Sequence, residues 1–116
     1  IEGIGRQRVE TSFIASSIDR MMRVPDAASI ASVLLLERLI GTRAGASTGT
    51  SLWASLRIVS EMVAAGRRGS VVSLICDPGE RYLDKYYSAD WLSDEQIDIA
   101  PYERRLEEFM RTGVMG

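Results

Sequence analysis

A run of small, hydroxyl-bearing residues lies directly before an apolar stretch that has helical spacing. The run covers residues 45–51 and reads GASTGTS, and the apolar stretch covers residues 52–65. The start of a helix carries unpaired N–H donors and the positive end of the helix dipole, which attract polar or anionic ligand atoms. Hydroxyls with so little bulk suit a planar polar cofactor packed against the backbone. An ordinary helix cap by Ser47 or Thr48 is the alternative, and the local pattern leaves both open.

A second polar loop follows the most apolar run of the chain. Residues 70–76 (SVVSLIC) are rich in β-branched side chains and predict a buried strand that ends at the turn 77–79. A short extended piece over residues 43–47 precedes the hydroxyl run. In parallel sheets the carboxyl ends of the strands meet at one edge, where ligands bind. We therefore expect residues 45–51 and 77–79 to face the same side of a sheet.

The remaining elements predict an α/β fold with parallel strands flanked by helices. Residues 1–18 are interpreted as a loop, and Gly41 and Gly66 as helix stops. Helical or extended patterns give a strand over 18–24 that ends at Pro25, a helix capped by Asp26 over 27–40, a helix over 50–65, short helical pieces around 81–86 and 90–96, and a helix over 102–111. Two or three strands cannot cover the run 70–76, which is apolar on both faces. The missing neighbours are expected to come from chain before Ile1.

Composition narrows the classes of function. The net charge of −2 disfavours a nucleic-acid partner, and no apolar run is long enough to cross a membrane. The absence of histidine and the single cysteine, Cys76, make a metal site very unlikely and fit a reducing cytoplasm. Because Ile1 is not an initiator methionine, the chain is interpreted as a piece of a longer protein.

Three motifs in order resemble the last third of the cysteine synthase family. These are the β-replacing pyridoxal-phosphate enzymes with the tryptophan-synthase-β fold. The motifs are residues 2–5 (EGIG), residues 45–49 (GASTG) and residues 79–83 (GERYL). Residues 24–28 (VPDAA) are similar to a bacterial subgroup that includes both cysteine synthases and cysteine desulfhydrases. The resemblance covers essentially the whole chain.

The resemblance implies a fold and a missing part. The fold is the C-terminal part of a type II pyridoxal-phosphate enzyme, three-layered, with parallel strands between helices. Residues 1–116 would form the C-terminal portion of the large cofactor-binding domain. The family's Schiff-base lysine and phosphate-binding loop lie earlier, and Lys85 is out of register with that role. We therefore expect this chain to be inert alone.

The resemblance also assigns residues beside the cofactor. Ser47 matches the serine that binds the pyridine nitrogen, where a neutral hydroxyl keeps the ring a milder electron sink than an aspartate would. Cys76 replaces the family's usual proline beside the ring, and it is either near the ring or only part of the core. Asp77 either reaches the ring nitrogen or only forms the turn that ends a strand.

The resemblance also places a group of residues on the substrate side of the cofactor. Gly3, Ile4 and Gly5 resemble the segment that closes on the substrate, and Arg6 belongs to the same loop. Arg6 and Arg8 either hold a substrate carboxylate or phosphate, or are solvated loop charges.

The resemblance implies synthesis of cysteine from O-acetylserine or O-phosphoserine and sulfide, in a cytoplasmic homodimer. The alternative within the same chemistry is cysteine desulfhydration, which gives sulfide, pyruvate and ammonia. A non-catalytic module that docks a partner through Tyr102, Leu106 and Phe109 is the alternative of another class. A nucleotide-binding domain is disfavoured because Gly41, Gly45 and Gly49 match neither phosphate-binding pattern.

Overall fold

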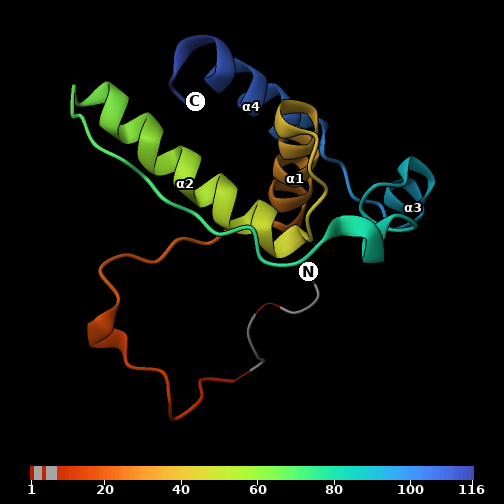
Figure 1. Ribbon diagram of the computed structural model, residues 1–116, viewed down its shortest axis with the longest axis horizontal. Coiled ribbons are helices and arrows are strands. Elements are labelled where there is room, and N and C mark those ends of the chain that lie inside the picture. The colour runs from red at the N-terminus through yellow and green to blue at the C-terminus, as the bar shows by residue number, and fades with distance from the viewer. Residues whose placement is uncertain (2–3, 5–7) are drawn as a thin grey trace.

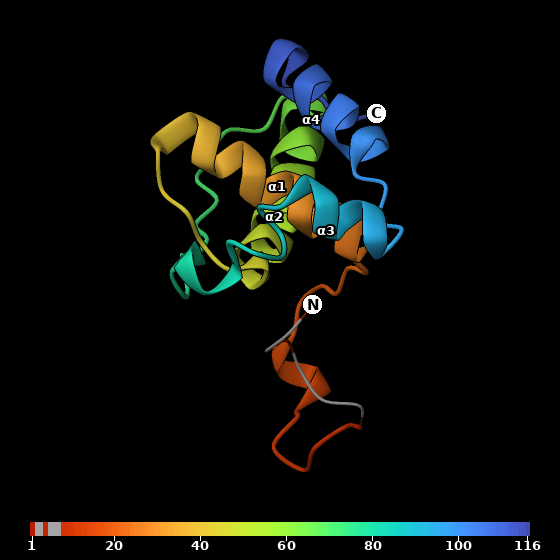
Figure 2. The same cartoon turned by 90° about the vertical axis from the view of Figure 1, so that its right-hand side faces the viewer.

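The computed structural model describes Ile1, Ile4 and residues 8–116. Three helices form its body (Figure 1) and shorter helical elements accompany them. The elements in chain order are η1 (Ala15–Ser17), α1 (Asp26–Ile40), α2 (Ala46–Ala64), η2 (Gly79–Tyr82), α3 (Ala89–Asp94) and α4 (Ala100–Thr112). Much of the described segment before residue 20 extends away from the helices (Figure 2). None of the described helices is long and apolar enough to cross a membrane.

Helix α1 confirms the predicted helix over residues 27–40. Its N-cap is Pro25, in an extended conformation, so that Asp26 lies in the first turn instead of capping it. A carboxylate there faces the positive end of the helix dipole. Gly41 ends the helix in the left-handed conformation at φ 70°, which glycine adopts without steric cost.

Helix α2 begins at Ala46, four residues before the predicted start at Thr50. The small residues at its start were expected to form a loop, but they let α2 approach α1 closely. A Cβ added at Gly49 would lie 1.9 Å from the backbone oxygen of Ser29 on α1. The packing of the two helices therefore compensates for the poor helix propensity of a glycine inside α2.

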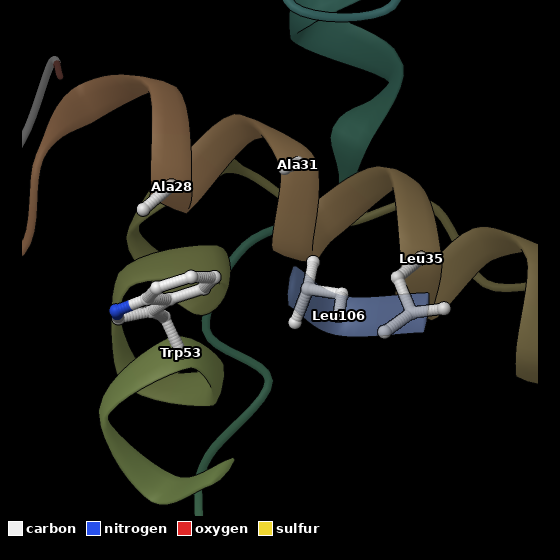
Figure 3. Packing of buried hydrophobic residues seen from close by; sticks show 5 residues of the cluster. All are labelled: Ala28, Ala31, Leu35, Trp53 and Leu106. Atoms are coloured by element: carbon white, nitrogen blue, oxygen red, sulfur yellow. The ribbon is translucent and has the colours of Figure 1, made fainter. Parts of the chain in front are cut away.

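The core joins the three long helices. Ala28, Ala31 and Leu35 on α1 meet Trp53 on α2 and Leu106 on α4 (Figure 3). Leu106 is fully buried among them. The predicted apolar side of the last helix is therefore intramolecular core, which removes the docking surface that a partner-binding module would have used.

The predicted strands 18–24 and 70–76 were wrong for this chain in isolation. Both are extended, yet the described residues contain no strand ladder and only one isolated antiparallel bridge, between Ala44 and Pro78. Val72 is 86% exposed and Leu74 is 75% exposed. A strand becomes part of a sheet only when neighbours accept and donate its backbone hydrogen bonds, and no described segment provides them. The parallel three-layer arrangement stays a prediction.

Candidate functional site

The two predicted polar loops meet at the N-terminus of α2. The backbone N–H of Gly45 donates to the oxygen of Asp77, and the N–H of Gly79 donates to the oxygen of Arg43, both at 3.0 Å. Figure 1 shows the segment after α2 running back along that helix to this point. The two loops therefore meet, as expected, but through an isolated antiparallel bridge and not at the edge of a described sheet.

Ser47 is the second residue of α2 and does not cap the helix. The N-cap is Gly45, and no side chain of the described residues caps this helix end. Ser47 is half-buried, and its hydroxyl makes no hydrogen bond within the described part of the chain. The hydroxyl is therefore available to donate to a ligand atom or to accept from one, beside the N–H groups of the first turn.

Thr48 has a structural partner that the sequence did not reveal. Its Oγ1 accepts a hydrogen bond of 3.0 Å from the backbone N–H of Cys76. Thr48 is 3% exposed whereas Cys76 is exposed, so this bond is partly buried. The bond ties the extended segment before Asp77 to the first turn of α2. Cys76 itself is exposed, and its Sγ lies 3.9 Å from the backbone oxygen of Leu74.

The carboxylate of Asp77 faces Gly45 and Tyr82. Its Oδ2 accepts a hydrogen bond of 2.9 Å from the Tyr82 hydroxyl, and its Oδ1 is buried without a partner among the described residues. A Cβ added at Gly45 would lie 2.1 Å from that Oδ1, so only glycine fits there. The hydrogen bond to Asp77, together with burial, raises the pKa of Tyr82 above its usual value.

The predicted substrate-side segment is described only at Ile4. Gly3, Gly5 and Arg6 lie outside the described residues. Ile4 lines a cavity of about 260 Å³ together with Ile1, Val24, Asp26 and Thr50. Thr50 lies one helical turn after Ser47, so this cavity opens beside the same end of α2. Arg8 is an exposed side chain that pairs with Glu10 at 3.2 Å.

Comparison with known proteins shows what the chain is similar to. It is 50% identical over 112 residues to the L-cysteine desulfhydrase Cds1 of Mycobacterium tuberculosis, a match that covers 97% of this chain and 30% of that protein. It is 30% identical over 99 residues to cysteine synthase 2 of Schizosaccharomyces pombe, covering 84% of this chain and 24% of that protein. The chain belongs to the cysteine synthase and cysteine desulfhydrase family.

A third relative names the family's cofactor. The chain is 31% identical over 86 residues to a putative pyridoxal-phosphate dependent protein of Caenorhabditis elegans, covering 71% of this chain and 20% of that protein. The chain thus spans less than a third of the length of these curated relatives, and it matches their C-terminal part. No family model and no solved structure matches it.

The described residues fit the nitrogen-bearing side of pyridoxal phosphate. Ser47 offers a hydroxyl at the α2 N-terminus that is unpaired among the described residues, while the buried Oδ1 of Asp77 faces Gly45 beside it. Within the described part of the chain, no three histidine, cysteine, aspartate or glutamate residues group as metal ligands. The family resemblance assigned roles to Ser47, Cys76 and Asp77. Thr48 and Tyr82 lie within its motifs without an assigned role, Tyr87 lies outside them, and no local pattern encodes the contacts of these three hydroxyls.

Proposed function

We propose that this chain is the C-terminal part of a pyridoxal-phosphate enzyme that breaks or makes the bond between Cβ and sulfur in cysteine. Its similarity to a cysteine desulfhydrase and to a cysteine synthase supports the reaction class. The observation that carries the proposal is the Ser47 hydroxyl, which is half-buried at a helix N-terminus and unpaired within the described residues.

The proposal includes the fold of the longer enzyme. Residues 1–116 would form the C-terminal portion of its large domain, a three-layer type II fold, and further strands would come from the remaining length. The extended segment after α2 supports this, because Val72, Leu74 and Ile75 are all more than half exposed in the chain alone. Apolar side chains in an extended segment are typical of a strand that is buried on both faces. A homodimer of such enzymes is part of the same expectation.

Ser47 would set the electronic character of the site. When bound, pyridoxal phosphate withdraws electrons from Cα, so that the α-proton and the substituent on Cβ can leave. The Ser47 hydroxyl is neutral, so it donates a hydrogen bond to the ring nitrogen without stabilising a full positive charge there. A carboxylate in the same place would stabilise that charge. The serine therefore favours loss of the β-substituent over transamination.

The other predicted residues would shape the edges of the pocket. Cys76 and Asp77 would lie beside the ring, where Thr48 fixes the Cys76 backbone at 3.0 Å. Gly3, Ile4, Gly5 and Arg6 would close on the substrate side. The Schiff-base lysine would come from outside this chain, so the chain alone would be inert. Lys85 is half-buried just beyond η2, and it is not assigned that role.

The degree of similarity favours desulfhydration over synthesis. Identity to the desulfhydrase is 50%, against 30% to the synthase. In the favoured reaction cysteine and water give sulfide, pyruvate and ammonia, so the Cβ–sulfur bond and the Cα–nitrogen bond both break. The second candidate is the formation of cysteine from a serine ester and sulfide. Release of sulfide from cysteine, compared with cysteine formation from O-acetylserine and O-phosphoserine, distinguishes the two in the full-length enzyme.

Substitution of Ser47 tests the cofactor assignment. In the full-length enzyme we expect Ser47→Ala to weaken pyridoxal-phosphate binding about tenfold and to shift the absorbance of the bound cofactor, because a hydrogen bond to a buried ring atom is lost. Binding is measured by titrating the apoenzyme. The control is Ser51→Ala, since Ser51 is an exposed serine on the same helix. Unchanged affinity and absorbance in Ser47→Ala would contradict the assignment.

A further inference from the structure

Two tyrosine hydroxyls contact the two loops that meet at the N-terminus of α2, and both tyrosines belong to one short segment. Tyr82 ends η2, and Tyr87 lies five residues later. We propose that Tyr82 and Tyr87 are positioning residues that fix the N-terminus of α2, and with it Ser47, against the cofactor ring. The identity of the cofactor rests on the proposed function. The positioning rests on contacts between described residues.

The backbone pairing between the two loops is too short to fix them alone. It consists of the bonds from Gly45 to Asp77 and from Gly79 to Arg43. Pro78 lies between Asp77 and Gly79 and has no N–H with which to extend the pairing. An isolated backbone hydrogen bond contributes little net stability where water can compete for it. The loops therefore depend on additional contacts.

Tyr87 provides the first of these contacts. Its hydroxyl accepts a hydrogen bond of 3.0 Å from the N–H of Ala44 and donates one of 2.7 Å to the oxygen of the same residue. Ala44 is fully buried, so without Tyr87 both backbone groups would lose their partner away from water. The guanidinium of Arg43 lies 5.7 Å from the centre of the Tyr87 ring and packs over it. A single phenol thus satisfies the backbone groups that a neighbouring strand would otherwise pair.

Tyr82 acts on Gly45, the residue after Ala44, through the side chain of Asp77. Its hydroxyl donates to Asp77 Oδ2 at 2.9 Å, which directs the second carboxylate oxygen onto Gly45. The side chain is only 9% exposed, and its ring centre lies 5.0 Å from that of Tyr86. Because packing restricts the Tyr82 ring, its hydroxyl has little freedom to follow a displaced carboxylate. The position of Asp77, and of Gly45 beneath it, is therefore set by Tyr82.

Both contacts lie within three residues of Ser47. Ala44 and Gly45 lead directly into α2, and Ala46 packs in the same buried cluster as Tyr82 and Ile30. A helix moves as a rigid body, so displacement of its first residue displaces the Ser47 hydroxyl with it. Ligand-binding groups must be held to within about 0.5 Å by the residues around them. Loss of either tyrosine hydroxyl should therefore weaken cofactor binding without removing any group that touches the cofactor.

The experiment removes single hydroxyl groups in the full-length enzyme. The variants are Tyr82→Phe and Tyr87→Phe. The matched control is Tyr102→Phe, whose ring packs 5.5 Å from Trp53 and whose hydroxyl makes no hydrogen bond within the described residues. Without cofactor, hydrogen exchange of residues 43–48 should become about fivefold faster or more in the first two variants, the order expected when one hydrogen bond (Tyr82) or two (Tyr87) are lost, and should not change in the control. With pyridoxal phosphate, only the first two should show weaker binding and a shifted absorbance of the bound cofactor.

The outcomes separate this inference from the proposed function. Unchanged exchange in both tyrosine variants would overturn it, as would an equal change in Tyr102→Phe. Faster exchange with unchanged cofactor affinity and absorbance would also overturn it, because the hydroxyls would then stabilise the loop without positioning Ser47. A wild-type enzyme that binds no pyridoxal phosphate would refute the proposed function. The exchange measurement would still show whether the two hydroxyls hold the loop.

Discussion

Adjacent hydroxyls at the start of α2 have different roles because a helix turns by about 100° per residue. Thr48 points toward the returning segment and accepts the N–H of Cys76 at 3.0 Å. Ser47 precedes it by one residue and finds no partner within the described residues. The same functional group is thus structural at one position and available to a ligand at the next. The direction in which each side chain leaves the helix, and not the residue type, determines which role it has.

Asp77 and Tyr82 form a pair whose electrostatics can be tested by titration. The pKa of Tyr82 is raised by its hydrogen bond to Asp77 and by burial. We expect Asp77→Asn to lower that pKa toward about 10, because a neutral amide no longer opposes the tyrosinate charge. Titration of phenol absorbance, with Tyr82→Phe to assign the signal, measures the shift. Asp84→Asn is the control, since Asp84 is an exposed carboxylate two residues from Tyr82. An unchanged titration in Asp77→Asn would contradict the pairing.

The raised pKa of Tyr82 determines the direction in which pH changes the stability of the folded protein. Because the pKa of Tyr82 is raised in the folded protein, the folded state holds this proton more tightly than the unfolded state does. The stabilisation that protonated Tyr82 provides is fully present below its unfolded pKa of about 10, and it is lost as the pH rises through its pKa in the folded protein. Wild-type stability should therefore fall more steeply at alkaline pH than that of Tyr82→Phe.

At the scale of elements, sequence patterns predicted those helices whose buried faces lie within this chain. α1 and α4 follow the apolar spacing closely, because the residues that cover them are present. The start of α2 was missed, since its small residues are helical only through their contact with α1. The predicted strands 18–24 and 70–76 were wrong in the isolated chain for a different reason. A sequence pattern encodes the tendency to pair, whereas the ladder also needs a neighbouring strand.

In the candidate site, too, some features were indicated by the sequence and others were not. The family motif pointed to Ser47 and to the two loops, and the structure brings those loops together at 3.0 Å. No sequence pattern indicates the contact of Tyr87 with Ala44, which lie 43 positions apart. Such a contact depends on how η2 docks after α2, and that docking is a property of the folded chain.

The contact of α1 with α2 offers a test at the element scale. We expect Gly49→Ala to destabilise the protein by about 2 kcal/mol, because its Cβ would lie 1.9 Å from the Ser29 backbone oxygen and the helices would have to separate. This cost exceeds the gain of about 1 kcal/mol in helix propensity. The midpoint of urea unfolding measures the change. Gly69→Ala is the control, since its added Cβ meets only the flexible end of Met62, and an equal loss in both variants would contradict the packing argument.

For the whole molecule, the main feature is an apolar extended segment beside a helical body. Val72 and Leu74 are 86% and 75% exposed, although exposing two such side chains in one short segment is unfavourable. A cavity of about 180 Å³ lies between this segment and the helices, lined by Leu36, Thr48, Leu52, Ser73, Leu74 and Ile75. The relatives are more than three times as long as the matched part, and in the proposed fold the covering strands would come from that remaining length.

Hydrogen exchange of residues 71–75 tests whether that sheet forms. In the chain alone their N–H groups donate to no described residue, so we expect exchange close to that of an unfolded peptide. In the full-length enzyme, pairing with neighbouring strands should slow exchange on the order of 100-fold, because the bonds then open only with the sheet. Residues 54–58 inside α2 are the internal reference, since they are helical without any partner chain. Equal exchange of residues 71–75 in both proteins would show that this segment stays unpaired, and the proposed three-layer fold would then be wrong.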